Sequence, residues 1–335
     1  MEIIFFSEGN QHTRFFDQLL TLSASKNFEI TLITLDEKDN LIKNQSISNV
    51  IIPKNNVEKI KILNNLSGDY FITTTPGIGH SYFPKSKIWP KDKRPKYVYL
   101  FHSLVSPNEM YAKNSFKNFD IIFSPSEKIK KQLEYLVPKD LKIIVSGYLL
   151  FDKKSVHPII NNSQKKVLIA PTWGDSGLIS DLESLKEIEE YLTNKNFEVI
   201  IRPHPMTFQN KNIMKNLNTF NLDHTHAVEN FNEYEFLITD YSGIALEYYF
   251  FTKKPTLFID SSKKIKREIQ KKERSLLLIE NIMRDIIGNT ISLKKNKEEI
   301  KLPEIKNQQK AQELINSFYN ENSSLSVIEK TLFEI

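Results

Sequence analysis

Three short polar segments in the second half of the chain each follow an apolar run that is typical of a buried strand. They are Ala170-Pro-Thr-Trp-Gly-Asp-Ser176, Arg202-Pro-His-Pro205 and Asp240-Tyr-Ser-Gly243. Because the carboxyl ends of parallel strands meet at one edge of a sheet, we expect the three segments to lie together. Arg202 would offer a planar cationic fork, His204 an imidazole donor, and the turn at Ser242 a set of backbone N–H groups. Together these groups predict a cradle for a diphosphate.

The third segment lies inside residues 236–260, a stretch typical of a strand, a small polar turn, a helix and a second strand. Its Ser242 and Gly243 fall where the helix should begin. Unpaired backbone N–H groups and the helix dipole favour a negative ligand at such a point. Since Asp and Ser are also common helix caps, an ordinary capped crossover in an α/β domain is the alternative.

His102 directly follows the strand-like run 97–101, so it should emerge at the carboxyl end of a buried strand. An imidazole there can gain or lose a proton near neutral pH, which suits acid–base work in a cleft. A surface or loop-packing histidine is the alternative, since histidine is only moderately buried on average. His80, after Gly79, is a weaker candidate of the same kind.

Short apolar runs alternate with helical patterns along both halves of the chain, which predicts βαβ units around parallel sheets. We expect strands at 3–6, 29–34, 70–74, 97–101, 121–124, 142–146, 166–170, 197–201 and twice within 236–260. We expect helices at about 12–25, 56–66, 126–136, 181–194, 207–217, 275–290 and 304–333. A polar run with a proline divides the two series. The prediction is a Rossmann-like domain over 1–150, a linker over 151–164, a second domain over 165–303, and helices over 304–335 that could pack back on the first domain.

The composition limits the class of protein. A chain of 335 residues is long enough for two domains, and no apolar run reaches the length of a transmembrane helix. The N-terminus starts directly with a strand-like run, so no secretory signal is expected. The absence of cysteine excludes disulfides, thiolate metal sites and a cysteine nucleophile, and it agrees with a reducing compartment. We therefore expect a cytoplasmic protein.

The net charge of +5 comes mainly from lysine. The lysine-rich runs at 263–272 and 294–301 contain glutamates, which favours solvated helix faces over nucleic-acid binding. A weak attraction to anionic lipid headgroups leaves peripheral membrane association open. No two histidines stand four residues apart beside a carboxylate, so no metal site is expected, and His224 and His226 are read as loop histidines. The common phosphate-loop, dinucleotide and serine-hydrolase motifs are missing.

Several motifs occur in an order that resembles one known family, over about residues 95–260. They are Tyr97-Val-Tyr-Leu-Phe-His-Ser103, Gly147-Tyr-Leu-Leu-Phe-Asp152, Leu168-Ile-Ala-Pro-Thr-Trp173, Arg202-Pro-His204 and Leu237-Ile-Thr-Asp-Tyr-Ser-Gly243. The family is that of the CDP-glycerol glycerophosphotransferases, the teichoic-acid and capsule polymer enzymes of the GT-B fold. The resemblance implies an α/β protein with two Rossmann-like parallel-sheet domains facing a central cleft, the first for the acceptor and the second for the nucleotide donor.

The resemblance also implies a reaction. An acceptor hydroxyl of a polyol or glycan attacks the glycerol-bearing phosphorus of CDP-glycerol and CMP leaves, without a metal ion or cofactor. His102 would be the general base, because imidazole can accept a proton near the working pH. His204 would act with it at the reacting centre by stabilising charge on the leaving CMP.

The remaining implied site residues belong to the donor. Glu247 could reach ribose hydroxyls, with a solvated helix carboxylate as the alternative. The other implied donor-binding residues are Arg202, Thr172, Trp173, Asp240, Ser242 and Gly243.

Other functions fit the same motifs. The His-Pro and Asp-x-Ser-Gly patterns also resemble a UDP-N-acetylglucosamine 2-epimerase, and another nucleotide-sugar glycosyltransferase would use the same cradle. Gly243 stands where the family usually has a second hydroxyl residue, so a related nucleotide donor is a further alternative. A glycan- or nucleotide-binding module without turnover is the non-enzymatic alternative.

Overall fold

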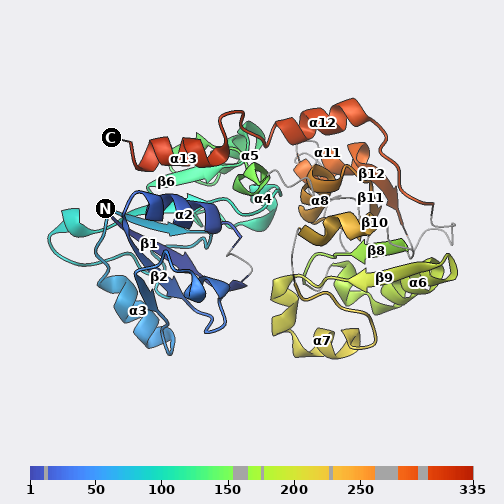
Figure 1. Ribbon diagram of the computed structural model, residues 1–335, viewed down its shortest axis with the longest axis horizontal. Helices are drawn as coiled ribbons and strands as arrows, with labels where there is room; N and C mark the ends of the chain where they lie inside the picture. The colour runs from blue at the N-terminus through green and yellow to red at the C-terminus, as the bar shows by residue number, and fades with distance from the viewer. Residues whose placement is uncertain are drawn as a thin grey trace. The chain divides into compact units, whose positions relative to one another are not determined.

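The computed structural model describes residues 1–10, 14–153, 165–174, 177–225, 229–260, 278–292 and 301–334. The chain divides into two compact units, Met1–Lys153 with Ser317–Ile335, and Lys154–Asn316. Each unit is built on its own parallel sheet with helices packed on it (Figure 1). The predicted α/β class with two parallel-sheet domains is therefore confirmed. Most of the predicted linker, residues 154–164, lies outside the described residues.

The first sheet has seven parallel strands in the order β3-β2-β1-β4-β5-β6-β7. Six of them lie within a residue or so of the predicted runs, because strands buried on both faces read as continuous apolar segments. The exception is β3, a three-residue edge strand with two exposed residues, whose short apolar run Val50-Ile51-Ile52 was not predicted as a strand. The strands are β1 (Glu2–Ser7), β2 (Glu29–Thr34), β3 (Asn49–Ile51), β4 (Tyr70–Thr73), β5 (Lys96–Leu100), β6 (Ile121–Ser124) and β7 (Lys142–Val145).

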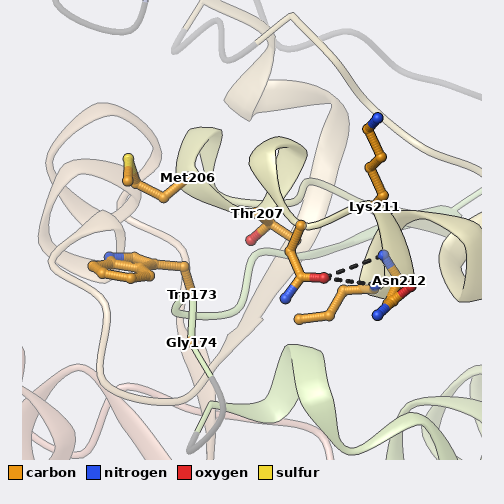
Figure 2. Close-up of a pocket in the computed structure, with 8 residues that line it drawn as sticks. Trp173, Gly174, Met206, Thr207, Lys211 and Asn212 are labelled. Atoms are coloured by element: carbon orange, nitrogen blue, oxygen red, sulfur yellow. Dashed lines mark hydrogen bonds between the residues drawn. The ribbon is translucent and has the colours of Figure 1, made fainter.

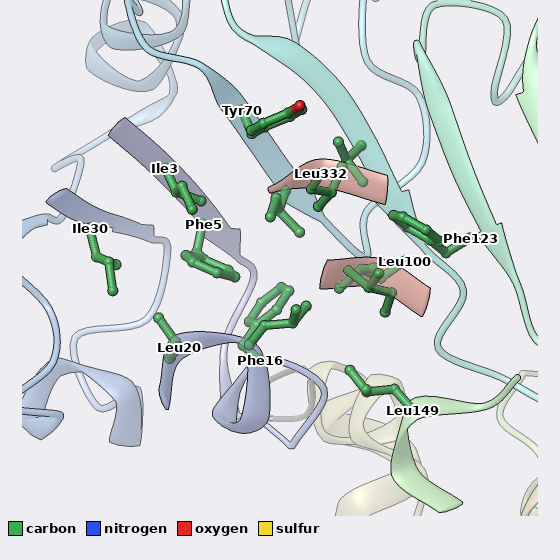
Figure 3. Close-up of a cluster of buried hydrophobic side chains, with 14 of the residues drawn as sticks. Ile3, Phe5, Phe16, Leu20, Ile30, Tyr70, Leu100, Phe123, Leu149 and Leu332 are labelled. Carbon is green, nitrogen blue, oxygen red and sulfur yellow. The ribbon is translucent and has the colours of Figure 1, made fainter. Parts of the chain in front are cut away.

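The helices of the first unit are α2 (Asp17–Ser25), α3 (Asn56–Asn64), α4 (Pro107–Met110), α5 (Glu127–Leu133) and α13 (Ser324–Leu332). Ser126 caps α5, since its side chain accepts a hydrogen bond from the N–H of Ile129. The core includes residues from both ends of the chain: Figure 3 shows Phe5 and Phe16 beside Leu332 of α13. Each such fully buried side chain stabilises the unit by roughly 1.5–3 kcal/mol.

The segment Gly147 to Asp152 fastens α13 to this unit. Gly147 has a φ of +89°, and a Cβ atom there would lie 2.7 Å from the Ser324 hydroxyl. The Asp152 carboxylate accepts hydrogen bonds from the N–H groups of Ser324 and Leu325 at 3.0 and 2.8 Å. An acidic group at a helix N-terminus is favoured by the helix dipole. The family-like motif Gly147-Tyr-Leu-Leu-Phe-Asp152 therefore has a structural role.

The second sheet has five parallel strands in the order β12-β11-β10-β8-β9. They are β8 (Lys165–Ile169), β9 (Phe197–Ile201), β10 (Tyr234–Thr239), β11 (Thr256–Ile259) and β12 (Gly288–Ile291). Among its described residues the helices are α6 (Leu182–Asn194), α7 (Lys211–Leu217), α8 (Ile244–Thr252), α11 (Ile279–Ile286) and α12 (Gln308–Asn316). From β8 the chain runs outward to β9 on one side, and from β10 it runs to β11 and β12 on the other. The crevice between the carboxyl ends of β8 and β10 is thus the switch point at which open α/β sheets bind ligands.

Two predictions for this unit were wrong. The helix expected at 275–290 ends at Ile286, and the edge strand β12 follows it. Gly288 passes so close to β11 that a Cβ atom would lie 1.7 Å from the carbonyl oxygen of Thr256. The helix expected at 207–217 begins at Lys211, after a 3-10 helix over Pro205–Gln209 and the cap residue Asn210.

Candidate functional site

Asp240 joins the two loops that flank the switch point. Its side chain is fully buried, and its Oδ1 accepts hydrogen bonds from the N–H groups of Thr172 and Tyr241, both at 2.8 Å. The Thr172 hydroxyl donates to the same oxygen, and the N–H of Leu178 donates to Oδ2 at 2.9 Å. The carboxylate is thus engaged by the protein itself. This corrects the predicted donor-binding role: Asp240 holds the loop after β8 against the turn after β10.

Gly177 makes this junction sterically possible. A Cβ atom at Gly177 would lie 2.3 Å from the carbonyl oxygen of Thr172 and 3.3 Å from the Asp240 carboxylate. Only glycine allows so close an approach of two backbone segments. Sequence reasoning did not single out Gly177, because its neighbour across the junction comes from a different loop.

The turn at Ser242 and Gly243 presents backbone donors at the start of α8. Among the hydrogen bonds of the described residues, none is donated by the N–H groups of Ser242 and Gly243. The helix that follows has nine residues, so its dipole adds to the attraction for a negative group. The geometry suits the predicted anion site, and binding itself stays a prediction.

Gly243 can be tested by a pair of substitutions. Its φ of −63° and ψ of −12° are ordinary helical values, so Gly243→Ser should leave the CMP dissociation constant within about twofold. Gly243→Pro also fits this φ but removes the N–H, and it should weaken CMP about tenfold, since one hydrogen bond to a charged group contributes roughly 1.5 kcal/mol. Calorimetric titration with CMP measures both. Equal affinities for the two variants would contradict a contact through the Gly243 N–H.

A cluster of three side chains, Tyr241, Asp260 and Arg284, supports the turn after β10 and was not predicted. The Arg284 guanidinium lies 4.4 Å over the Tyr241 ring and pairs with the Asp260 carboxylate, which also accepts from the Tyr241 hydroxyl at 3.3 Å. Burial alone would lower the pKa of Arg284, and Tyr241 and Asp260 together hold it above its ordinary value. The cluster supports the turn after β10. No local pattern indicates it, because Arg284 and Asp260 belong to different elements.

Arg202 also differs from its predicted role. Its side chain is 3% exposed, and its Nε and Nη2 atoms donate to the Asp223 carboxylate at 2.8 and 2.6 Å. The guanidinium stacks on the Phe231 ring at 5.1 Å. Burial by itself would raise the pKa of Asp223, but hydrogen bonds from Thr225 and the charge of Arg202 lower it below its ordinary value. The predicted fork for a diphosphate thus points into the protein, and Arg202 fixes the loop after β9.

His204 follows this arginine and is half-buried. Its Nδ1 accepts a hydrogen bond from the backbone N–H of Met206 at 3.2 Å. An N–H group can only donate, so the neutral imidazole must carry its proton on Nε2. His204 can therefore donate a hydrogen bond to an anion, as the predicted role requires.

Trp173 lies beside His204, with their ring centroids 6.2 Å apart. The indole is 45% exposed and lines a pocket of about 670 Å³ (Figure 2). Thr172 is fixed by its hydrogen bonds to Asp240. Glu247 on α8 is only 4% exposed, so the alternative of a solvated helix carboxylate is wrong. Its contact with a ribose stays a prediction.

His102 belongs to the first unit and follows β5, as predicted. Its Nδ1 lies 3.3 Å from the Tyr99 hydroxyl, which lies 3.4 Å from the Tyr111 hydroxyl. Burial raises the pKa of Tyr99 well above its ordinary value and raises that of Tyr111, so both phenols stay protonated near neutral pH. The Tyr148 hydroxyl donates to the backbone carbonyl of His102 at 3.2 Å. These three tyrosines were not predicted as supporting residues.

The tyrosines allow His102 to act as a base. If Nδ1–H donates to the Tyr99 oxygen, Tyr99 can in turn donate to Tyr111. The neutral imidazole then has its unprotonated nitrogen at Nε2, where a substrate hydroxyl could transfer a proton. Alternation along β5 places Tyr99 and Tyr97 on the same face of the sheet, but it gives no signal for a contact with His102, which follows the strand.

The other histidines have simpler settings. His80 is exposed and stacks on Tyr82, and His224 contacts the ring of Phe208. His12, His157, His226 and the lysine-rich runs at 263–272 and 294–300 lie outside the described residues. Within the part of the chain that the structure describes, no group of three or more histidine or acidic residues could hold a metal ion. In the same part, no helix has the length and apolar character needed to cross a membrane.

Two parallel-sheet α/β units with polar loops at their carboxyl edges define the class of two-domain proteins to which the GT-B enzymes belong. A family model described as CDP-Glycerol:Poly(glycerophosphate) glycerophosphotransferase matches residues 90–324. The chain therefore belongs to this family, as its motifs indicated, and it is a glycerophosphotransferase.

Solved structures agree on the fold. The wall teichoic acid polymerase TagF, in a variant soaked with CDPG, has a TM-score of 0.60 and 17% identity, and the match covers 99% of this chain and 89% of that chain. The UDP-GlcNAc 2-epimerase of Methanocaldococcus jannaschii, in complex with UDP-GlcNAc and UDP, has a TM-score of 0.60 and 12% identity over 99% of both chains. At these identities the likeness concerns the fold alone. No curated protein matches the chain in sequence.

Proposed function

We propose that this glycerophosphotransferase moves a glycerol phosphate, or a related polyol phosphate, from a CDP-linked donor to a hydroxyl of a cell-surface polymer or glycan and releases CMP. The observation that carries the proposal is the pair of N–H groups at Ser242 and Gly243, which donate no hydrogen bond within the described part of the chain. They lie at the N-terminus of α8 and at the switch point of the second sheet. A site of this kind binds a phosphate group through its backbone. Membership of the family supplies the class of donor.

In the proposed reaction, His102 accepts the proton of the acceptor hydroxyl at Nε2 while the hydroxyl oxygen bonds to the glycerol-bearing phosphorus. The bond from this phosphorus to the bridging oxygen breaks, and the electron pair leaves with CMP. The Nε2–H of His204 and the N–H groups of Ser242 and Gly243 would stabilise the charge that develops on CMP. We propose that these donors suffice without a metal ion or cofactor.

The buried charges of the second unit would position these donors and would not touch the substrate. Asp240 fixes the loop that carries Thr172, and the Arg202–Asp223 pair fixes the loop that carries His204. Arg284 supports the turn at Ser242 through Tyr241. Such preorganised donors need no rearrangement when charge develops in the transition state.

We also propose that the enzyme works in the cytoplasm, at the inner face of the membrane. The absence of cysteine agrees with a reducing compartment, and a net charge of +5 favours a surface of anionic lipid.

Release of CMP tests the proposed function. Incubation with CDP-glycerol and a poly(glycerol phosphate) or glycan acceptor should release CMP only when both substrates are present. Thermal shift against CDP-, UDP- and GDP-linked donors identifies the donor independently, because a ligand of the native state raises its apparent stability. Intact nucleotide binding without CMP release would contradict the proposal. Conversion of UDP-N-acetylglucosamine at C2 without an acceptor, followed by NMR, would favour the epimerase alternative.

A further inference from the structure

The pocket beside Trp173 lies apart from the donor turn. Its walls come from the loop after β8, with Trp173 and Gly174, and from the segment after β9, with Met206 to Ile213 (Figure 2). The donor turn at Ser242 follows β10, which lies on the other side of β8. The loop after β8 therefore has the predicted phosphate site on its β10 side and this pocket on its β9 side.

The apolar part of the pocket consists of two large exposed side chains. Trp173 is 45% exposed and Met206 is 37% exposed, although side chains of this size are usually more deeply buried. An indole face and a thioether offer broad, polarisable contact to the C–H groups of a ligand. A cavity of about 670 Å³ is within the range of small-molecule sites.

The polar part of the pocket includes a hydroxyl without a partner. Thr207 is 3% exposed, and its Oγ1 has no hydrogen-bond partner among the described residues. In Figure 2 this oxygen turns toward the side of the pocket where Trp173 lies. A buried polar group that lacks its hydrogen bond costs about 1–3 kcal/mol, so a ligand hydroxyl that reaches Thr207 would recover part of that cost.

The pocket also has an oriented amide and one charged lining residue. Oδ1 of Asn210 accepts hydrogen bonds from the N–H groups of Asn212 and Ile213, both at 3.2 Å, so its Nδ2 remains as a donor (Figure 2). Lys211 is the one charged side chain among the described lining residues. The pocket thus combines an apolar wall, hydroxyl and amide groups, and a single positive charge.

We infer that this pocket binds a glycerol phosphate unit of the acceptor chain, and this inference rests on the proposed function. The apolar wall matches the carbon backbone of a polyol, Thr207 and Asn210 match its hydroxyls, and Lys211 matches its phosphate. The phosphates of a nucleotide donor are predicted to bind at the Ser242 turn, so only the neutral nucleoside could enter this pocket, and it would leave Lys211 without a counterpart. The inference therefore replaces the donor-binding role predicted for Trp173. The Trp173 ring lies beside the His204 ring, with the centroids 6.2 Å apart, so a unit bound against the indole lies next to a group proposed to act on the reacting phosphate.

Fluorescence can test the inference without turnover. The chain has two tryptophans, and Trp89 lies in the first unit with 79% exposure, so Trp89→Phe leaves Trp173 as the single indole. A synthetic glycerol phosphate trimer should change the emission of this variant in a saturable way. Adding Thr207→Val should lower the affinity for the trimer about tenfold, because one hydrogen bond contributes about 1 kcal/mol or somewhat more. The affinity for CMP should stay unchanged.

Two further variants control this result. Thr193→Val makes the same chemical change at an exposed position of α6 and should leave trimer affinity unchanged. Lys211 is accessible, so its loss does not endanger folding. Lys211→Gln should lower the affinity for the trimer and reduce the salt dependence of its binding. Steady-state kinetics should show the same pattern, with a raised KM for the acceptor chain and an unchanged KM for CDP-glycerol.

The possible results separate the inference from the proposed function. Failure of the trimer to bind would overturn the inference. So would an affinity for the trimer in Thr207→Val and Lys211→Gln equal to that of the parent protein. A weaker affinity for CMP with unchanged trimer binding would assign the pocket to the nucleoside. Failure of the wild-type chain to release CMP would overturn the proposed function, and the trimer titration would still decide whether the pocket takes a glycerol phosphate.

Discussion

Replacing His102 by alanine is expected to lower kcat for CMP release by about 10²–10⁴-fold, the usual contribution of a positioned general base. The imidazole follows β5 and is half-buried, with its Nδ1 against the buried Tyr99 hydroxyl. Its loss should therefore remove the proton acceptor without unfolding the first unit. Donor affinity should not change, because the predicted donor groups belong to the second unit. Stopped-time assays of CMP release and calorimetric titration with CMP measure the two effects separately.

Two variants of the same unit sharpen this prediction. His80→Ala removes an exposed histidine that contacts Tyr82, and it should keep wild-type activity. Tyr99→Phe keeps the buried ring but removes the hydrogen bond to Nδ1, so the imidazole loses the partner that selects its tautomer. We expect about a tenfold lower kcat, equivalent to one hydrogen bond, with an unchanged KM for the donor. If His102→Ala kept more than a tenth of the wild-type rate, another group would have to be the base.

Much of the fold was predictable because its strands are buried on both faces. Apolar-rich runs marked the interior strands β2 and β6 to the residue, since a central parallel strand needs apolar side chains on both sides. The two missed strands are edge strands, where one side of the ladder is open and the apolar requirement is weaker. In β12 the pairing depends instead on Gly288, which lets two backbones approach. A lone glycine is equally common in turns and loops, so it does not mark a strand by itself.

The site was predictable as a place more than as a set of roles. The helix start after Ser242 was predictable, because its signal is local in sequence, and the use of its backbone N–H groups by a ligand stays a prediction. Arg202 and Asp240 were read as ligand contacts, but each has a partner supplied by another loop, Asp223 in one case and Thr172 in the other. A charged residue after a strand has the same appearance in sequence whether it faces a ligand or a buried partner. Only the tertiary pairing distinguishes the two.

Asp240→Asn is expected to lower the free energy of unfolding of the second unit by about 2–4 kcal/mol. The carboxylate accepts from three N–H groups and one hydroxyl in a fully buried position. An asparagine has one acceptor oxygen, so its amide NH₂ would face the N–H of Leu178 or those of Thr172 and Tyr241. Each buried donor left without an acceptor costs about 1–3 kcal/mol. Urea unfolding followed by Trp173 emission in the Trp89→Phe background reports on this unit directly.

The matched control is Asp285→Asn, the same change at an exposed position of α11, which should alter stability by no more than about 0.5 kcal/mol. Asp240→Asn should also lower the affinity for CMP under conditions where the unit is still folded. The reason is that the loop carrying Thr172 and the turn carrying Ser242 are held together by this one carboxylate at the switch point. A stability equal to that of the control would show that the two loops keep their positions without it. In that case the preorganised donors at Ser242 and Gly243 would depend on the Tyr241–Asp260–Arg284 cluster instead.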